Sequence, residues 1–396
     1  MKHHSKRNKG MLIKDKKIAI IGGGPAGLTL ARLLQMKGAD VKVYERDIHK
    51  DVRVQGATLD LHEDSGLAAL RKAELLEAFQ KNYRPGADLI RITDNVGHIY
   101  YDQHAEIITQ DFGHEHFRPE IDRGPLRNIL LESLAPDTVV WNSHIVALER
   151  TGDSWRLQLN NNNTLVADIV IAADGANSCI RPFITPIKPF YAGVTIIEGT
   201  VYEAATTTPQ IHSLVKGGKI FALRDSKTLI VSAKGDGSLA FYTGCKTHEL
   251  WVNDCGLDFN DHTQLLTWFK EEFASWDTIW HELFNGNTHF TPRPQYCMPL
   301  DQNWESQTNI TMIGDAAHLM PPYAGEGVNM AMQDALELSE CLTNERFINL
   351  RAAISHYEDK MLNRTSAIAA ITLQQTEALH SPQGLTHMLN MFKEHV

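Results

Sequence analysis

The pattern of apolar and polar positions predicts a strand–helix–strand unit at the start of the chain. Residues 17–21 are a short apolar run that ends in glycines, which is typical of a buried parallel strand. A Leu- and Ala-rich helix is expected at 26–36, with Pro25 at its first position and Gly38 as its left-handed stop. The next strand is expected at 41–45, which completes one βαβ unit.

Further helices and strands follow from the same periodicities. Segments with one apolar face predict helices at 65–79, 123–134, 261–273, 327–342 and 352–379. Strands are expected at 155–159, 165–172 and 309–313, the first two joined as a hairpin by the asparagines of 160–163. Four β-rich runs separated by turn residues predict an antiparallel meander rather than more βαβ units, at 194–202, 219–223, 228–233 and 239–244.

Length, charge and cysteine usage narrow the class of protein. A chain of 396 residues exceeds the ~250–300 residues at which a single core usually stops growing, so we expect two domains or one domain with a large insertion. The formal net charge of -10 makes nucleic acid a poor partner. The five scattered cysteines favour reduced thiols in a cytoplasmic protein over disulfides or a zinc site, so no metal is expected. Residues 1–11 are expected to form a flexible basic arm, and no apolar run reaches the ~18 residues that a membrane span requires.

A glycine-rich loop between the first strand and the first helix indicates dinucleotide binding. Residues 22–27 read G-G-G-P-A-G. Gly22 permits a tight turn, Gly24 lets the backbone approach a pyrophosphate, and Gly27 lets the helix pack closely on the sheet. The helix N-terminus offers N–H groups to the phosphates, and Glu45 at the end of the next strand can accept hydrogen bonds from ribose hydroxyls. A glycine-rich turn without a ligand is the alternative, but the complete βαβ context favours a dinucleotide.

A second motif, at 314–329, indicates that the dinucleotide carries a flavin. Asp315 follows a predicted strand, where it can bond a ribitol or ribose hydroxyl. Pro322 stiffens the loop, and Gly325 and Gly327 allow a flat ring system to lie against the backbone. The helix that starts near Gly327 points its N-terminal dipole at the ring, which would stabilise the negative charge of a reduced flavin. Taken alone, this segment is equally compatible with a strand, a turn and a capped helix that bind nothing.

Together with Asp174-Gly175 in the middle of the chain, these motifs resemble the class A flavoprotein monooxygenases, the para-hydroxybenzoate hydroxylase type. That family has a G-x-G-x-x-G with a distant Glu, a central D-G and a G-D-A-A-H, and this chain has them in the same order. Within the family, the chain is most similar to the tetracycline-inactivating monooxygenases, on the strings at 57–62, 119–123, 315–322 and 324–329. The resemblance implies that NAD(P)H reduces FAD, which reacts with O2 and oxygenates a polycyclic or aromatic substrate through a flavin C4a-hydroperoxide. Because the cofactor carries this chemistry, no side chain is expected to act as a general acid or base.

The same resemblance implies which residues bind the cofactors. Asp60, Arg123 and Asp315 would contact FAD. Arg53 would bind the nicotinamide nucleotide, and Asp174-Gly175 would serve both nucleotides. The full set of expected cofactor-binding residues is Gly22, Gly24, Pro25, Ala26, Gly27, Glu45, Arg46, Arg53, Asp60, Arg123, Asp174, Gly175, Asp315, Pro322, Gly325, Gly327, Val328 and Asn329. His62 and His318 are expected to have structural roles.

We therefore predict an α/β Rossmann-like FAD-binding domain that is discontinuous in sequence, a β-sheet substrate domain and a C-terminal bridging helix. The expected FAD-binding domain comprises 12–78, 106–184 and 292–350, and the expected substrate domain comprises 79–105 and 185–291. The bridging helix is expected within 351–396. We also expect the protein to be a monomer.

The substrate side departs from the tetracycline-inactivating enzymes. Where those relatives have an amide, a guanidinium and an imidazole, this chain has Glu198, Lys219 and Ala240, and Tyr323 can border the same site. Lys cannot reproduce the planar fork of Arg, and Ala lacks a ring donor. A tetracycline-type antibiotic is therefore one candidate substrate, and an aromatic compound of catabolism or natural-product biosynthesis is another. An FAD-dependent dehydrogenase and a non-catalytic ligand-binding flavoprotein remain alternatives, whereas a halogenase is disfavoured because the chain has no W-x-W-x-I string.

Overall fold

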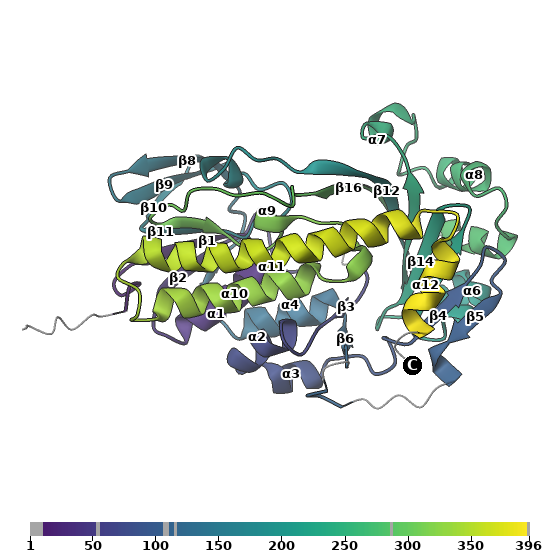
Figure 1. The fold of residues 1–396 in the computed structure, drawn as a ribbon, viewed down its shortest axis with the longest axis horizontal. Helices are drawn as coiled ribbons and strands as arrows, with labels where there is room; N and C mark the ends of the chain where they lie inside the picture. The colour runs from purple at the N-terminus through teal and green to yellow at the C-terminus, as the bar shows by residue number, and fades with distance from the viewer. Residues whose placement is uncertain (1–10, 53–55, 106–110, 115–116, 286–287, 394–396) are drawn as a thin grey trace, which may run out of the picture.

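Two layered parts lie side by side along the long axis of the molecule, each built on its own large sheet (Figure 1). The computed structural model describes residues 11–52, 56–105, 111–114, 117–285 and 288–393. The first part contains a five-stranded parallel sheet, and the second contains a seven-stranded mixed sheet. This arrangement confirms the predicted fold class, an α/β dinucleotide-binding part with a β-sheet part beside it.

The parallel sheet has the strand order β17-β11-β1-β2-β7. Its strands are β1 (Lys17–Ile21), β2 (Asp40–Tyr44), β7 (Val139–Val140), β11 (Ile169–Ala172) and β17 (Ile310–Met312), and all neighbours are parallel. The helices that pack beneath it are α1 (Pro25–Gln35), α2 (Gly66–Lys72), α3 (Leu76–Gln80), α4 (Arg123–Glu132) and α10 (Gly327–Thr343). A three-stranded antiparallel sheet of β8 (Ile145–Thr151), β9 (Ser154–Leu159) and β10 (Thr164–Ala167) lies against β1 and β11.

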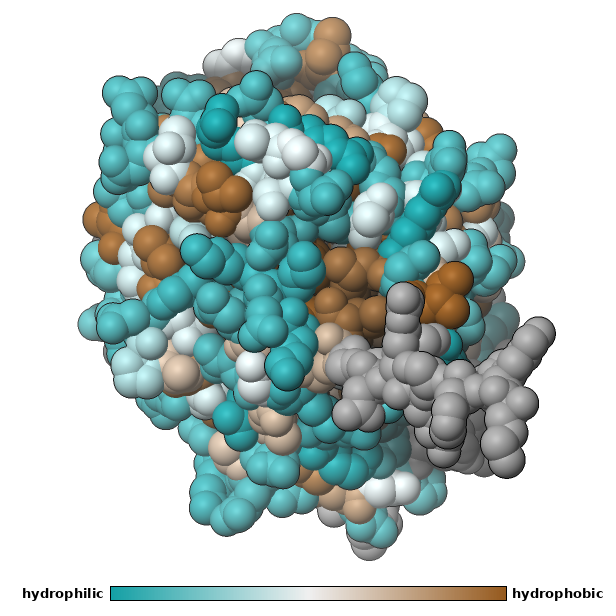
Figure 2. Space-filling view, turned by 90° about the vertical axis from the view of Figure 1, so that its left-hand side faces the viewer, coloured by the Kyte–Doolittle hydropathy of each residue, from teal (hydrophilic) through white to brown (hydrophobic). Residues whose placement is uncertain are grey.

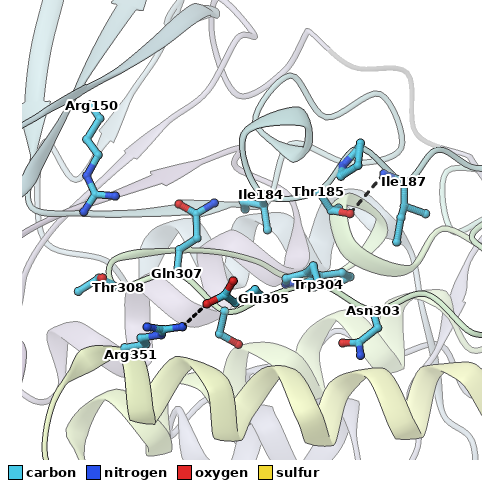
Figure 3. Close-up of a pocket in the computed structure, with 12 residues that line it drawn as sticks. Arg150, Ile184, Thr185, Ile187, Asn303, Trp304, Glu305, Gln307, Thr308 and Arg351 are labelled. Atoms are coloured by element: carbon cyan, nitrogen blue, oxygen red, sulfur yellow. Dashed lines mark hydrogen bonds and ion pairs between the residues drawn. The ribbon is translucent and has the colours of Figure 1, made fainter.

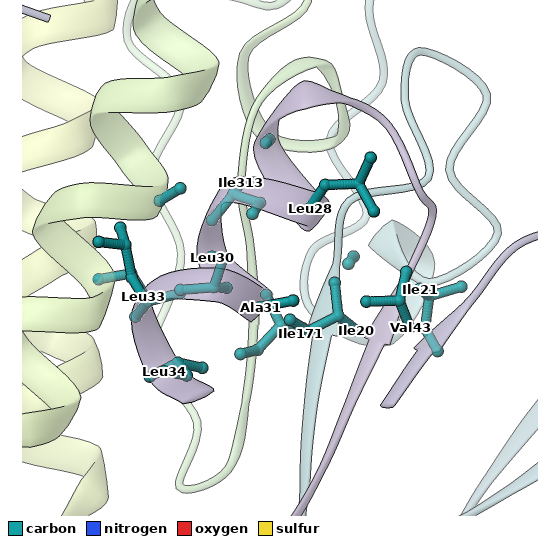
Figure 4. Packing of buried hydrophobic residues seen from close by; sticks show 14 of the residues in the cluster. Ile20, Ile21, Leu28, Leu30, Ala31, Leu33, Leu34, Val43, Ile171 and Ile313 are labelled. Carbon is teal, nitrogen blue, oxygen red and sulfur yellow. The ribbon is translucent and has the colours of Figure 1, made fainter. Parts of the chain in front are cut away.

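The core of this part explains why β1 and α1 form as the sequence predicts. Every residue of β1 after Lys17 is buried, as a parallel strand covered on both faces requires. Side chains of β1, β11 and α1 interdigitate in Figure 4, among them Ile20, Ile171, Leu28 and Leu30, each fully buried. Burial of each such side chain stabilises the fold by roughly 1.5–3 kcal/mol. The two elements that flank the glycine loop, β1 and α1, are therefore anchored in a well-packed core. The end of the molecule shown in Figure 2 is mostly hydrophilic, with hydrophobic residues in small groups.

The second part is built on a sheet with the strand order β16-β12-β15-β14-β13-β4-β5. Its strands are β4 (Ile90–Thr93), β5 (Ile99–Asp102), β12 (Phe190–Val201), β13 (Lys219–Arg224), β14 (Lys227–Ala233), β15 (Leu239–Lys246) and β16 (Thr288–Cys297). The remaining elements are the two-stranded pair β3 (Leu59–Asp60) and β6 (Glu120–Ile121), α5 (Ala204–Thr207), α6 (Pro209–Val215), α7 (Trp251–Asp254), α8 (His262–Glu272), α9 (Asp315–His318) and the 3-10 turns η1 (Gln103–Ala105), η2 (Arg181–Phe183), η3 (Thr278–Phe284) and η4 (Pro322–Ala324).

The two faces of the seven-stranded sheet have different environments. Alternate residues such as Ile197, Val231 and Phe241 point into a hydrophobic core with aromatic side chains of α8 and η3. Because side chains alternate along a strand, Glu198, Ile230 and Tyr242 point to the opposite face. We call this opposite face the ligand-side face, since the contacts described below connect it to the motifs at 56–62 and 314–329.

Two C-terminal helices connect the parts. The long helix α11 (Leu350–Leu379) packs against α10, α9, η4 and β12, and runs across both halves of the molecule in Figure 1. This confirms the predicted C-terminal bridging helix. A further helix that the sequence analysis did not predict, α12 (Gly384–Lys393), packs on β4 and β13 of the seven-stranded sheet.

Three predicted elements were wrong in detail. The helix expected at 65–79 is broken into α2 and α3 by Glu74, which adopts a left-handed backbone with φ of 61°. The strand expected at 165–172 divides at Asp168, whose carboxylate accepts hydrogen bonds from Lys17 N at 2.9 Å and Ser154 Oγ at 3.0 Å. The expected hairpin is confirmed for β9 and β10. The expected meander is antiparallel from β13 to β15, but β13 also pairs with β4 in parallel, so the sheet is mixed.

The predicted domain boundaries and terminal arm are not settled by these elements. β16 crosses the predicted boundary at 291/292, and the division of the chain into domains stays a prediction. Residues 1–10 of the expected arm lie outside the described residues, whereas Met11 packs partly buried against the first core. In the part of the chain that the structure describes, no helix is long and apolar enough to cross a membrane.

Candidate active site

In the glycine loop after β1, one glycine faces open space and two are closely packed. Gly22 has a φ of +111°, and a Cβ there would lie 2.2 Å from the carbonyl oxygen of Ala173. A Cβ on Gly27 would lie 2.1 Å from the carbonyl oxygen of Gly22. A Cβ on Gly24, in contrast, would meet no atom within 4 Å. The loop therefore needs Gly22 and Gly27 for its own packing, while Gly24 leaves free space for a ligand beside the backbone.

The N-terminus of α1 faces this open side without a side-chain cap. Pro25 is its first residue, followed by buried Ala26, and the first turn has no acidic residue. The main-chain N–H groups and the positive end of the helix dipole are therefore available for an anion such as a pyrophosphate.

Glu45 is fully enclosed at the end of β2 and holds the loop from the other side. Its Oε2 accepts a hydrogen bond of 2.6 Å from Gly23 N, and its Oε1 accepts one of 3.0 Å from Asp47 N. Arg127 of α4 lies 4.0 Å from this carboxylate and bonds Asp47 at 3.1 Å. Glu45 thus fixes the shape of the glycine loop, in addition to the ribose contact expected of it. Arg46, the next expected residue, is exposed.

The central D-G pair lies directly after β11, next to the glycine loop. Asp174 Oδ2 accepts a hydrogen bond of 2.9 Å from Cys179 N, whereas its buried Oδ1 has no partner among the described residues. Gly175 has a φ of +79°, which favours glycine, and a Cβ there would meet nothing within 4 Å. An unpartnered carboxylate oxygen beside an open glycine suits a hydroxyl or N–H donor of a nucleotide.

Arg181 joins the D-G segment to the third motif, and the sequence analysis missed it. Its Nε donates to the carbonyl oxygen of Ala316 at 2.7 Å, and its Nη2 donates to those of Ala176 and Asp315 at 3.0 and 2.9 Å. Burial lowers the pKa of Arg181, and the charges of Asp174 and Asp315 oppose that effect. The only sequence signal is an arginine six residues after Gly175, which nothing in the local pattern marks as buried.

Buried Asp334 of α10 fixes the 314–318 turn. Its Oδ2 accepts hydrogen bonds from Gly314 N at 2.8 Å and from His318 Nε2 at 2.5 Å, and its Oδ1 pairs with Arg364 of α11 at 2.5 Å. His318 therefore contacts a structural carboxylate, in keeping with the structural role expected of it. The turn leaves Asp315 exposed, and Arg181 Nη2 bonds both its main-chain carbonyl and that of Ala176, next to the D-G pair.

The loop at 322–329 lies against the strand that carries Asp60. Asn329 is central to this contact, because its Nδ2 donates to the carbonyl oxygen of Asp60 at 3.0 Å and its Oδ1 accepts from His62 N at 2.9 Å. Gly325 has a φ of +71°, and a Cβ there would lie 3.5 Å from Asp60 Oδ1. Pro322 and Gly325 are exposed, and Gly327 and Val328 are half-buried at the uncapped N-terminus of α10.

Around Asp60 lies a group of charged side chains. Its Oδ2 is 2.9 Å from His62 Nε2, and His62 Nδ1 is 3.5 Å from Glu326. Burial alone would raise the pKa of Asp60, but the hydrogen bond with His62 and the charge of Lys219 lower it below its usual value. His62 thus supports Asp60, as its expected structural role implies.

Lys219 connects this group to the ligand-side face. It lies on β13 and forms an ion pair with buried Glu120 of β6, which is the register partner of Asp60. Burial alone would lower the pKa of Lys219, but the charges of Glu120 and Asp60 raise it, so the side chain is an ammonium.

The other expected substrate residues share the ligand-side face with Lys219. Glu198 pairs with Arg293 of β16 and lies close to Gly56, since a Cβ on Gly56 would be 2.9 Å from Glu198 Oε1. Ala240 is fully buried two residues before Tyr242, on the same side of β15. Tyr323 reaches this face at Gly244 and lies 3.2 Å from His380 Nε2.

Tyr242 and Arg123 join the sheet to the segment before Asp60. The Tyr242 hydroxyl accepts a hydrogen bond of 2.8 Å from Ala57 N, and Arg123 Nε donates to the carbonyl oxygen of Ala57 at 3.0 Å. Tyr242 was not predicted, although its spacing of two from Ala240 could have indicated it. Arg53 lies outside the described residues, so its expected contact with a nicotinamide nucleotide stays a prediction.

These residues fit FAD. The open side of Gly24 with the uncapped α1 could hold the pyrophosphate, the free Asp174 oxygen and exposed Asp315 could bond ribityl or ribose hydroxyls, and the uncapped α10 could face the ring. The structure brings together the three sequence motifs and the expected substrate residues. Among the described residues, no cluster of three or more His, Cys, Asp or Glu side chains could hold a metal ion.

A separate open cavity of about 560 Å³ lies away from these motifs (Figure 3). Polar side chains line it, including Arg150, Gln307 and the ion pair of Arg351 with Glu305. None of the expected cofactor or substrate residues borders it. The ligand-side face, and not this cavity, is therefore the candidate active site.

Comparison with known proteins identifies the family of this chain. The family model described as FAD binding domain matches residues 15–346. The chain is 29% identical to the monooxygenase asqM of Emericella nidulans, over 89% of this chain and 90% of the relative. It is 30% identical to the monooxygenase penA of Penicillium thymicola, over 82% and 84% of the two chains. The crystal structure of tetracycline destructase Tet(55) superposes with a TM-score of 0.74 at 18% identity over 96% of each chain, which shows a shared fold. The chain therefore belongs to the FAD binding domain family, in which these curated relatives are monooxygenases.

Proposed function

We propose that this flavin-dependent monooxygenase oxygenates an aromatic or polycyclic small molecule held against the ligand-side face, with NAD(P)H as reductant and O2 as the oxygen source. One observation carries the proposal. Glu198, Lys219 and Ala240 come from three strands, yet they share one sheet face, and that face is bonded to the segments expected to hold FAD. A substrate on this face would therefore lie beside the flavin.

FAD, when bound, supplies hydride acceptance from NAD(P)H and the activation of O2. The protein positions the cofactor and the substrate and determines their surroundings. The glycine loop and the N-terminus of α1 would hold the pyrophosphate, and the N-terminus of α10 would favour negative charge on the ring. On the sheet, Ile230 and Phe221 are half-buried apolar side chains that can contact an aromatic ring and exclude water.

Tyr242 is positioned to hold the substrate. Because its oxygen accepts a hydrogen bond from Ala57 N, its own proton is free to be donated to a carbonyl or phenol oxygen. Burial raises the pKa of Tyr242, as does the charge of Glu198, so the phenol keeps that proton at neutral pH.

The decisive experiment is to purify the protein, record its flavin spectrum, and follow NADH and NADPH oxidation with and without candidate substrates. The candidates are a panel of phenols, hydroxylated heteroaromatics and polycyclic compounds, and tetracycline. A gain of one oxygen atom in the product mass, with substrate-stimulated NAD(P)H loss, is the expected result. Stimulation by tetracycline would support the antibiotic-inactivating role, whereas stimulation by aromatic compounds alone would move the substrate to catabolism or biosynthesis.

A variant pair links the activity to the ligand-side face. Ile230→Trp places a large side chain on that face and should abolish substrate stimulation while FAD stays bound. Ile99→Trp, on the exposed edge strand β5, is the matched control and should behave as wild type.

Bound FAD with a dehydrogenated product would favour the dehydrogenase alternative. Bound FAD without NAD(P)H oxidation under any condition would favour a ligand-binding flavoprotein. Monomeric state and cytoplasmic location stay predictions.

A further inference from the structure

The basic residues that the strands place on the ligand-side face are all paired with carboxylates. Alternation along the strands puts three basic residues on this face among the described residues, namely Lys219, Lys246 and Arg293. Each of the three is already paired with a carboxylate of the protein. Lys219 pairs with Glu120, Arg293 pairs with Glu198, and Lys246 lies 2.6 Å from Glu377 of α11.

One of these pairs is shielded from solvent, since the side chains of Lys219 and Glu120 are 16% and 3% exposed. In the second pair the side chain of Glu198 is 12% exposed, whereas that of Arg293 is 54% exposed. Removing the acidic partner from the buried pair would leave an uncompensated charge, which is costly in a protein interior. Lys219 is therefore held by Glu120, and Arg293 has Glu198 as its carboxylate partner on this face.

The centre of the face is apolar or neutral. Ile230 and Phe221 occupy neighbouring strands in one row with Tyr242, and the next row contains the small buried side chains of Ala240 and Ser232. Tyr242 can donate one hydrogen bond without carrying charge. A ring with a carbonyl, lactam or phenol oxygen matches this surface, whereas a carboxylate would lose its hydration without gaining an unpaired cation from the strands.

We propose that the substrate is an uncharged aromatic or polycyclic compound and that the enzyme discriminates against aromatic carboxylates. This inference rests on the proposed function, since it assigns the substrate class of the same site. The Glu198–Arg293 pair is the specificity-determining element that can be tested, because neutralising Glu198 frees a guanidinium that can bind a carboxylate bidentately.

The test uses matched compounds that differ only in charge. 4-Hydroxybenzoate is compared with 4-hydroxybenzamide, 6-hydroxynicotinate with 6-hydroxynicotinamide, and 2-quinolone-4-carboxylate with its amide. Each is titrated into the FAD-loaded protein, and the change in the flavin spectrum gives a dissociation constant that does not depend on turnover. The amide of a pair is expected to bind at least about tenfold more tightly than the carboxylate, because the cations on the strands are paired and Arg123, the cation beside Tyr242, is the one expected to contact FAD.

Two variants connect this preference to the ion pair. Glu198→Gln should reduce the preference for the amide by about tenfold or reverse it, since Arg293 becomes available. The double variant Glu198→Gln with Arg293→Gln should restore the wild-type preference, and it also shows whether loss of Glu198 alone damages the site. If Glu198→Gln does not retain FAD, the wild-type titrations still decide the inference.

The outcomes separate the inference from the proposed function. Equal or tighter binding of the carboxylates to the wild-type protein would overturn the inference. Failure of every pair to perturb the flavin spectrum would overturn it too, since the face would then not take an aromatic ring. A clear preference for the amides without oxygen insertion into any compound would support the inference about binding and contradict the monooxygenase activity.

Discussion

The carboxylate of Asp334 accepts a hydrogen bond of 2.8 Å from the main-chain N–H of Gly314. The first residue lies inside α10, and the second begins the turn that exposes Asp315. Gly314 has a φ of +62°, so the turn adopts a conformation that favours glycine and depends on an external partner to hold it. The geometry of the expected flavin contact is thus set by a buried charge that need not touch the cofactor.

Neutralising this charge should loosen the turn and the packing of α11 together. Asp334→Asn leaves the buried side of Arg364 without one of its two carboxylate partners, so the free energy of unfolding should fall by about 3 kcal/mol. Denaturant unfolding measures this change, and release of FAD should occur at lower denaturant than in wild type. Glu340→Gln, on the exposed side of the same helix, is the control and should change stability by less than about 0.5 kcal/mol. Equal stability of Asp334→Asn and wild type would contradict this role.

Two glycine variants in one loop should separate folding from cofactor binding. Gly24→Ala meets no protein atom and has an ordinary backbone conformation, so the FAD-free protein should unfold within about 0.5 kcal/mol of wild type. Its Cβ occupies the open side of the loop, so affinity for FAD should fall at least about tenfold. Gly22→Ala has a positive φ and a clash with Ala173, so it should reduce stability itself. Thermal melts and flavin retention test both, and full FAD binding by Gly24→Ala would place the pyrophosphate elsewhere.

The parts of the structure that could be predicted are those whose cause is local. β1, α1 and the 22–27 loop agree with the sequence because apolar runs, Pro25 and the glycines each act within a few residues. The break at Glu74 could not be predicted, since a left-handed glutamate has no composition signal. β4 and β5 were missed for a related reason: β4 becomes a strand by pairing with β13, more than 100 residues away, and β5 then pairs with β4.

The candidate site shows the same division between local and distant causes. The motif residues around Gly24, Asp174 and Asp315 follow from the resemblance and lie together. Arg181 and Asp334, which join these motifs, make their contacts across 134 and 20 positions of sequence and carry no local pattern. The pairing of Lys219 with Glu120 spans 99 positions, and it shows that Lys219 is a neutralised cation and not a free one.

Cys179 should react slowly although its residue is exposed. Burial of the thiol, and then the charge and hydrogen bond of Asp174, raise its pKa to about 12. Since only the thiolate is nucleophilic, about 10⁻⁴ of the thiol is ionised at pH 8, and alkylation by iodoacetamide should rise about tenfold for each pH step from 8 to 10. Mass analysis of the labelled peptide gives the rate, with N-acetylcysteine as the control. A rate that levels off below pH 10 would show that the thiolate forms more easily than these contacts imply.

His380 should make the protein sensitive to mild acid. It is fully buried at the end of α11, where Nδ1 donates to the carbonyl oxygen of Thr376 at 2.8 Å and Nε2 faces the Tyr323 hydroxyl. Burial lowers its pKa to about 4, from 6.5 in the unfolded chain. Because the unfolded chain binds the proton more readily, the stability present above pH 6.5 is lost as the pH falls towards 4, by about 2 kcal/mol at pH 5.

The matched variants for this prediction remove one titrating imidazole each. His380→Gln cannot gain a proton, so its stability should change less than that of wild type between pH 7 and pH 5, by the same 2 kcal/mol or so. His248→Gln removes an exposed imidazole and should follow the wild-type curve. Urea unfolding at the two pH values measures all three proteins. The three proteins have the same carboxylates, so parallel curves for His380→Gln and wild type would mean that the pKa of His380 in the folded protein is close to its value in the unfolded chain.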